Sequence, residues 1–147
     1  MLVITFNGEV YNYLEIKKEL CLLGYVFFSD SDTEVILKAY HQWGIDSIKK
    51  FIGMFVIVIY DKKKQEIIII RDRVGIKPLY YYFDNNKFIF ASELKSIISS
   101  NATLSISKEG LYNFLQYGYI AKDLSIFENI KKLPAGNYLI FSIKKEN

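Results

Sequence analysis

The spacing of apolar residues predicts helices in the first third of the chain and strands in the middle. Apolar residues recur every three or four positions over 13–23 and again over 36–43, which is the period of an amphipathic helix. Two later segments, 54–60 and 67–70, are continuously apolar and are joined by a polar turn, as in a hairpin of buried strands. Because strands without alternation are covered on both faces, we expect this sheet to lie between two other layers.

The first apolar run, over 2–6, leads into Asn7-Gly8, where we expect the chain to bend toward the first helix. Asn-Gly between apolar residues also favours a hairpin turn, but the helical spacing that follows argues against a returning strand. A glycine that adopts φ > 0 between a strand and a helix leaves backbone N–H groups facing open space. Oxyanion holes are commonly built in this way, and the Asn7 side chain can add a second donor.

Polar residues and a glycine mark the ends of the first predicted helix. Asn12 and Glu15 have the spacing of a capping box, and Gly24 follows the last apolar position. The next residues, 25–28, form a short run of β-prone residues, which predicts a strand between the two helices.

The second predicted helix has boundaries of the same kind. Ser31 and Glu34 again have capping-box spacing, and Gly44 follows the apolar face. Asp32 lies in the first turn, where the positive end of the helix dipole favours a carboxylate whether or not it binds a ligand. From this segment alone, helix stabilisation is the simpler interpretation of Asp32.

The rest of the chain predicts shorter elements. We expect a short helix over 46–52 with Ile48, Phe51 and Ile52 buried, and a polar loop over 71–78. The further expected elements are a hairpin of 79–83 and 87–91 joined at Asp84-Asn85-Asn86, a helix over 93–99 capped by Ser92, a helix over 107–116 followed by Gly118, and a strand over 138–143.

Composition and charge then restrict the function. With 147 residues and 51% hydrophobic content, the chain can fill one folded domain and is too apolar to be disordered. The net charge of +3 comes from 19 basic and 16 acidic residues spread along the chain, so neither nucleic acid nor a membrane surface is an expected partner. Without a signal peptide or a membrane-spanning run, we expect a cytoplasmic location.

The chain has one cysteine, Cys21, and one histidine, His41. An internal disulfide is therefore excluded, and the usual ligand sets for zinc cannot be assembled. Carboxylates could still hold Mg²⁺, but we assign no residue as a metal ligand. Cys21 lies among leucines in the middle of the first predicted helix, and we expect it to be buried and inert.

Several short motifs occur in a fixed order along the chain. They are Phe6-Asn7-Gly8-Glu9-Val10-Tyr11-Asn12, Ser31-Asp32-Thr33-Glu34-Val35-Ile36, Gly53-Met54-Phe55, Arg71-Asp72-Arg73-Val74-Gly75-Ile76-Lys77-Pro78-Leu79-Tyr80-Tyr81, Phe90-Ala91-Ser92-Glu93-Leu94-Lys95 and Leu133-Pro134-Ala135-Gly136. Over residues 3–141 this order resembles the glutaminase domain of glutamine-hydrolysing asparagine synthetases. These enzymes are class II glutamine amidotransferases with the N-terminal-nucleophile hydrolase fold.

The resemblance implies an α+β fold arranged as a four-layer αββα sandwich, and it implies roles for four residues. The Asn7 side chain and the Gly8 N–H match the family's oxyanion hole. The carboxylates of Glu9 and Asp32 match its contacts to the α-amino group of glutamine. The domain itself needs no cofactor, whereas ATP and Mg²⁺ belong to a synthetase domain of the same polypeptide that uses the released ammonia to amidate aspartate.

The chain departs from the family pattern at its start. The family's nucleophile is a cysteine exposed as the first residue, whereas here Met1 is followed by Leu2, and the family's upstream arginine clamp has no match. We therefore expect residues 1–147 to be a partial class II amidotransferase domain, incomplete at the N-terminus and inactive alone. With a sheet edge uncovered it should be poorly stable or self-associate, which leaves a homodimer open.

Two alternatives remain open at this point. The intact protein could amidate a different carboxylate, such as a sugar acid in surface polysaccharide assembly. The chain could also be a non-catalytic paralogue that binds glutamine or a partner synthetase subunit.

Overall fold

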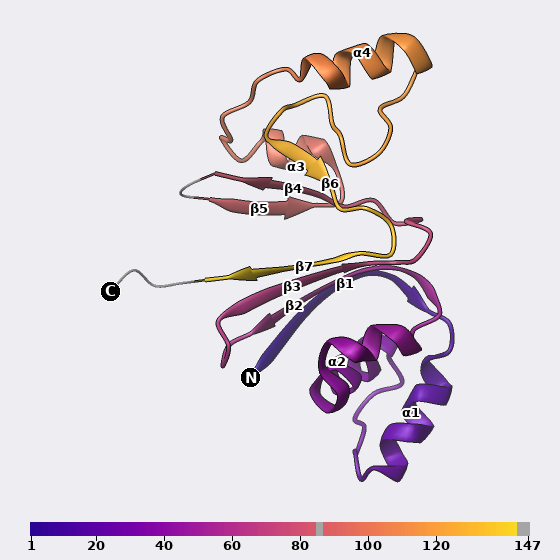
Figure 1. The fold of residues 1–147 in the computed structure, drawn as a ribbon. Coiled ribbons are helices and arrows are strands. Elements are labelled where there is room, and N and C mark those ends of the chain that lie inside the picture. The colour runs from indigo at the N-terminus through magenta and orange to yellow at the C-terminus, as the bar shows by residue number, and fades with distance from the viewer. Residues whose placement is uncertain (85–86, 144–147) are drawn as a thin grey trace. The chain divides into compact units, whose positions relative to one another are not determined.

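The computed structural model describes residues 1–84 and 87–143. The chain divides into two compact units, one formed by Met1–Ile76 with Gly136–Asn147 and the other by Lys77–Ala135. Each unit combines an antiparallel sheet with helices, which confirms the predicted α+β class (Figure 1). The predicted turn at Asp84-Asn85-Asn86 includes residues outside the described part of the chain.

The first unit contains a four-stranded antiparallel sheet with the strand order β1-β2-β3-β7. Its central hairpin is the one that the continuous apolar runs predict, and β1 and β7 are the edges of the sheet. The strands are β1 (Leu2–Val10), β2 (Gly53–Asp61), β3 (Glu66–Arg71) and β7 (Tyr138–Ser142).

Helices cover one side of this sheet (Figure 1). They are α1 (Tyr13–Leu22), α2 (Asp32–Trp43) and the 3₁₀ helix η1 (Gly44–Lys50). Their apolar faces pack against β1, β2 and β3 in one core, with Leu20, Ile36 and Ile57 fully buried. Ser31 caps α2 by accepting a hydrogen bond from the Thr33 N–H, and Gly44 ends the helix, as predicted.

The expected bend at Asn7-Gly8 is wrong, because β1 continues without interruption to Val10. Gly8 lies opposite Phe55 in the β1–β2 register and has φ +142°. A Cβ at Gly8 would lie 2.0 Å from the Met54 carbonyl oxygen. The glycine therefore allows a close approach of two strands and does not mark the entrance to the helix, which begins only after Asn12.

Two further predictions around the helices are also wrong. Residues 25–28 form no strand, because the Glu34 carboxylate accepts hydrogen bonds from the backbone N–H groups of Phe28 and Ser29 and ties this segment to α2 as a loop. Asn12 precedes α1 but does not cap it with its side chain. Its amide instead donates to the Lys50 carbonyl and accepts from the Ile52 N–H, at 2.8 and 2.9 Å.

Cys21 is exposed, not buried as predicted. The buried positions of α1 are Ile16 and Leu20, one helical turn apart, and the residue after Leu20 is rotated about 100° away from the core. Ile52 is likewise 56% exposed, whereas Phe51 beside it is buried. In both places the run of apolar residues in the sequence is longer than the row of side chains that packs against the core.

The second unit has a three-stranded antiparallel sheet with the order β5-β4-β6. Its small core is built around Tyr82, Ile97 and Ile130. The residue at the N-cap of α3 is Glu93 and not Ser92, which was predicted to cap this helix. The elements are β4 (Tyr80–Phe83), β5 (Phe88–Ala91), α3 (Leu94–Ile98), α4 (Lys108–Tyr117) and β6 (Ile130–Lys132), of which only β6 was not predicted.

In residues 1–84 and 87–143, none of the helices has the length and apolar character that crossing a bilayer requires.

Candidate functional site

The C-terminal half of β1 meets the N-terminus of α2 at one edge of the first unit's sheet. The Asp32 Oδ2 atom accepts a hydrogen bond from the Val10 N–H at 3.2 Å. Ser31 Oγ, also at 3.2 Å, accepts from the Thr33 N–H and fixes the first turn of α2. Two segments that are 22 residues apart in the sequence are therefore joined through one carboxylate.

The direction of the β1 backbone groups follows from two hydrogen bonds at its ends. The Lys62 N–H donates to the Met1 carbonyl and the Tyr11 N–H donates to the Ile52 carbonyl, so odd-numbered residues of β1 face β2. Because backbone groups alternate along an antiparallel strand, those of Gly8 and Val10 face outward from the sheet edge. The bond from Val10 to Asp32 agrees with this direction. The Gly8 N–H therefore points out of the same edge at which Asp32 lies.

A shallow depression of about 350 Å³ lies at this edge. It brings together three of the four predicted site residues, Gly8, Glu9 and Asp32. The fourth, Asn7, is not among the described residues of its lining. Its odd position places its side chain on the face of β1 away from the helices, as it does for Glu9, which lines the depression nonetheless. The lining consists of Gly8, Glu9, Tyr13, Asp30, Ser31 and Asp32.

The depression is rich in hydrogen-bond acceptors. Three of its six lining residues carry carboxylates, and one of these, Asp30, forms an ion pair with Lys17 at 2.8 Å. The hydrogen bond that Lys17 donates to Asp30 raises the pKa of Lys17. Such a site suits an ammonium group, and the outward N–H of Gly8 offers a donor to an oxygen atom.

Three residues of the depression, Tyr13, Asp30 and Ser31, were not predicted as site residues, and Ser31 was predicted only as a helix cap. Asp30 was part of a polar run read as a helix entrance, and Tyr13 was counted as an apolar helix position. The one available signal was the alternation of Asp30 and Asp32, which places two carboxylates near the start of α2. In the described part of the chain, no three His, Cys, Asp or Glu side chains are grouped so that they could hold a metal ion.

The motif around Asp72 lies elsewhere in the unit and has a different role. Asp72 is 1% exposed. Its carboxylate accepts from the backbone N–H groups of Phe55, Val74, Gly75 and Ile76, at 3.3, 3.1, 2.6 and 3.0 Å. This carboxylate holds the loop after β3 in shape.

Comparisons with known proteins show which family the sequence resembles. A family model described as "Glutamine amidotransferase domain" matches residues 1–147. A relative from Methanocaldococcus jannaschii, whose name classes it with the glutamine-hydrolyzing asparagine synthetases, is 44% identical over 98% of this chain and 28% of its own length. "Asparagine synthetase [glutamine-hydrolyzing] 2" from Bacillus subtilis is 41% identical over 94% of this chain and 19% of its own length.

Solved structures show the same fold. Glutamine phosphoribosylpyrophosphate amidotransferase from B. subtilis aligns with 66% of this chain and 23% of its own, at a TM-score of 0.59 and 25% identity. A structure described as the allosteric regulatory enzyme of purine biosynthesis aligns with 96% of this chain and 26% of its own, at a TM-score of 0.67 and 21% identity. The α+β fold is thus that of N-terminal-nucleophile amidotransferases.

The chain spans less than a third of the length of these relatives. The match of the family model to all 147 residues and the identity to the two synthetases lead to one conclusion. The chain belongs to the glutamine amidotransferase domain family.

Proposed function

We propose that this chain is the glutamine-binding part of the glutaminase of a longer, glutamine-hydrolysing asparagine synthetase. The observation that carries the proposal is that Gly8, Glu9 and Asp32 line one depression, with the Asp32 carboxylate held at the same sheet edge by the Val10 N–H. The names of the relatives support the substrate and the reaction.

In this proposal Glu9 and Asp32 hold the α-ammonium group of glutamine. Hydrogen bonds between an ammonium and a carboxylate are about twice as strong as neutral ones. Asp32 is well suited to this role, because its bond to the Val10 N–H and its place in the first turn of α2 fix its position. None of the described residues that line the depression is basic, so in this proposal the α-carboxylate of glutamine is contacted from elsewhere in the longer polypeptide.

The Gly8 N–H, with the Asn7 amide as the family pattern implies, stabilises the oxyanion. A cysteine thiolate supplied from outside the 147 residues attacks the side-chain amide carbon, and the amide oxygen takes up the negative charge. Collapse of this intermediate breaks the C–N bond, and the nitrogen leaves with a proton as ammonia. Water then hydrolyses the thioester to glutamate and regenerates the thiol. Exposed Cys21 is not among the described residues that line the depression.

The released ammonia would be used by a synthetase domain that amidates aspartate with ATP and Mg²⁺, in the cytoplasm. The length of the relatives beyond the matched segment supports such a further domain. Residues 1–147 alone are expected to show no glutaminase activity. Activity of this chain that Asn7→Ala abolishes would contradict an external nucleophile.

Nuclear magnetic resonance titration tests the binding site directly. L-Glutamine should shift the backbone amides of Gly8, Glu9 and Val10, and the shifts should disappear in Asp32→Asn. Asp46→Asn, which removes an exposed carboxylate from η1, is the matched control and should leave the shifts unchanged.

A glutamine analogue that lacks the α-amino group separates amine recognition from general binding. This analogue should cause much smaller shifts than glutamine. Shifts that survive Asp32→Asn, or that are equal for the two compounds, would refute the proposed roles of Glu9 and Asp32.

A further inference from the structure

The helix side of the four-stranded sheet is covered unevenly. Residues directly opposite each other in an antiparallel sheet point to the same face, so rows of side chains can be followed from β2 to β7. In each row the residues of β2 and β3 are at most 1% exposed, whereas those of β7 are 52% and 47% exposed. The two rows are Ile57-Ile70-Tyr138 and Ile59-Ile68-Ile140.

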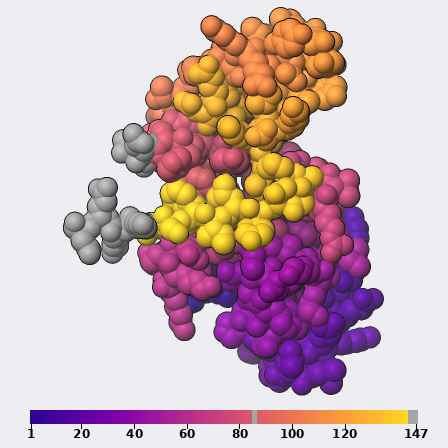
Figure 2. Space-filling model, in the orientation of Figure 1, coloured from indigo at the N-terminus to yellow at the C-terminus, as the bar shows by residue number. Residues whose placement is uncertain are grey.

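The cover therefore stops between β3 and β7. α2 and η1 bury the sheet as far as β3, but none of the described helices of this unit covers Tyr138 and Ile140. The surface of β7 is visible in yellow in Figure 2. A sheet face that carries large apolar side chains is normally buried against a second layer.

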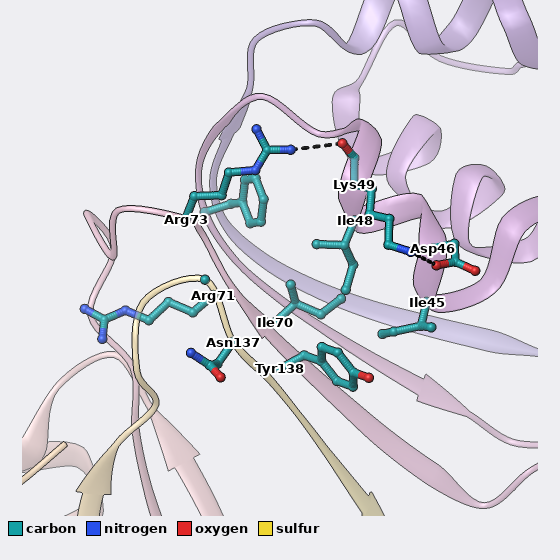
Figure 3. A pocket seen from close by; sticks show the side chains of 11 residues that line it. Ile45, Asp46, Ile48, Lys49, Ile70, Arg71, Arg73, Asn137 and Tyr138 are labelled. Carbon is teal, nitrogen blue, oxygen red and sulfur yellow. Dashed lines mark hydrogen bonds and ion pairs between the residues drawn. The ribbon is translucent and has the colours of Figure 1, made fainter.

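A cavity of about 310 Å³ lies at the boundary of the covered region. Ile45 and Ile48 of η1, Ile70 of β3 and Tyr138 of β7 converge on it (Figure 3). These four side chains give the cavity an apolar wall, and the cavity extends the open face of β7 toward η1. We call the cavity together with Tyr138 and Ile140 the β7 groove.

Charged residues at the rim of the β7 groove are mostly basic. Arg73 donates from Nη2 to the Lys49 carbonyl at 2.9 Å, which uses one of the five N–H groups of its guanidinium. Lys49 forms an ion pair with Asp46 at 2.6 Å. Arg71 also lines the cavity, but its guanidinium points away from the isoleucines and donates to the Gly75 carbonyl (Figure 3). Because Lys49 is paired with Asp46 and Arg71 points away, the guanidinium of Arg73 is the group at the rim that favours an acidic partner.

We propose that the β7 groove binds an amphipathic helix of the same longer polypeptide, from outside these 147 residues. The apolar side of this helix would cover Ile70, Tyr138 and Ile140, and an acidic side chain would meet Arg73. A helix is the fitting occupant because the neighbouring part of this face is already covered by helices, and because a sheet face offers no backbone groups to a strand. The relatives supply enough further chain, since the matched segment is 19–28% of their length.

The proposal does not depend on glutamine binding, because the β7 groove contains none of the residues that line the depression beside β1. Its test is a selection of helix-forming peptides from a displayed library against the 147-residue chain. Enriched peptides should carry apolar residues at i, i+3 or i+4, and i+7, with Asp or Glu beside that stripe.

Variants then locate the binding surface. Ile140→Asp should weaken an enriched peptide at least about tenfold, which corresponds to about 1.4 kcal/mol. Ile140→Thr keeps the β-propensity of an edge strand and should weaken binding in the same direction if Ile140→Asp fails to fold. Leu22→Asp, at an exposed apolar position of α1, is the matched control and should bind like the original chain.

A charge exchange tests the rim. Arg73→Glu should weaken the acidic peptides, and replacement of their acidic residues by lysine should restore binding to this variant. Enrichment of extended or basic peptides, no enrichment, or equal binding to Ile140→Asp would overturn the proposal. A dimer in sedimentation analysis that Ile140→Asp converts to monomer would also overturn it, because a second copy would then occupy the groove.

Discussion

Asp32 and Asp72 both lie in motifs that identify the family, and both accept hydrogen bonds from backbone N–H groups. The two carboxylates differ in how many hydrogen bonds they accept from the protein. Asp72 is buried and receives four N–H groups from β2 and from its own loop. Asp32 is half-buried and accepts the Val10 N–H and, at 3.5 Å, the Thr33 hydroxyl.

A carboxylate offers about four acceptor positions. In Asp72 the fold occupies them, whereas Asp32 lies at a depression and keeps capacity for a ligand. A family motif can therefore mark either a structural bond or a binding group, and only the environment of its side chain distinguishes the two. The following predictions test this distinction, from the largest expected effect to the smallest.

Replacement of Asp72 by alanine should destabilise the chain by at least about 3 kcal/mol, because several buried N–H groups lose their acceptor. Urea unfolding followed by circular dichroism measures this change. Asp72→Asn keeps one acceptor oxygen and should cost less. A loss below about 1 kcal/mol in Asp72→Ala would show that the loop does not depend on this carboxylate.

Gly8→Ala should cost about 2 kcal/mol or more, because the new Cβ would collide with the Met54 carbonyl and the φ of +142° is unfavourable for alanine. Gly24→Ala is the matched control, since Gly24 also has a positive φ, +90°, but open space around it. Its cost should be about 1 kcal/mol. Equal costs in thermal unfolding would mean that the contact with β2 is unimportant.

The loop before α2 should make stability depend on pH. Hydrogen bonds from Lys38 and then from Ser29 lower the pKa of Glu34 from 4.5 to about 2. A lowered pKa in the folded state means that the contribution is complete above pH 4.5 and is lost as the pH falls toward 2. Glu34→Gln should therefore flatten the stability curve in this window.

Glu109→Gln, which removes an exposed glutamate from the first turn of α4, is the control for the loss of a charge. It should leave the shape of the curve unchanged. Identical curves for Glu34→Gln and the original chain would exclude Glu34 as the anchor of this loop.

Asp32→Asn should change stability by less than about 1 kcal/mol, because an amide oxygen can still accept from Val10 and only a helix-terminal charge is lost. Thermal unfolding measures this small effect. A loss as large as that of Asp72→Ala would make Asp32 a structural residue and remove the contrast between the two.

The sequence was sufficient for the elements whose signal is local. The short apolar runs over 54–60 and 67–70, joined by a polar turn, favoured buried strands, and Ser31 and Gly44 marked the ends of α2. The three residues of β6 carry no such signal, because their strand exists only through pairing with β4. The residues next to β6 in the sequence give no indication that it pairs with β4.

Three residues of the depression, Gly8, Glu9 and Asp32, could be named from the sequence, but its geometry could not. A glycine after an apolar run permits a bend, and it also permits two strands to approach closely, and the sequence cannot distinguish these cases at Gly8. The outward direction of its N–H comes from the position of β1 at the sheet edge, which depends on the order of all four strands. Asp30 was missed because its place beside β1 follows from the loop that Glu34 anchors.

The bond between Val10 and Asp32 also limits how the sheet can grow. Along β1 the outward backbone groups belong to the even-numbered residues, from Leu2 to Val10, and the last of these N–H groups is already bound by Asp32. An additional strand could therefore pair with this edge from Leu2 to Gly8 and no further. One end of the additional strand would lie beside Asp32. The residue at that end of the strand would therefore lie at the rim of the depression.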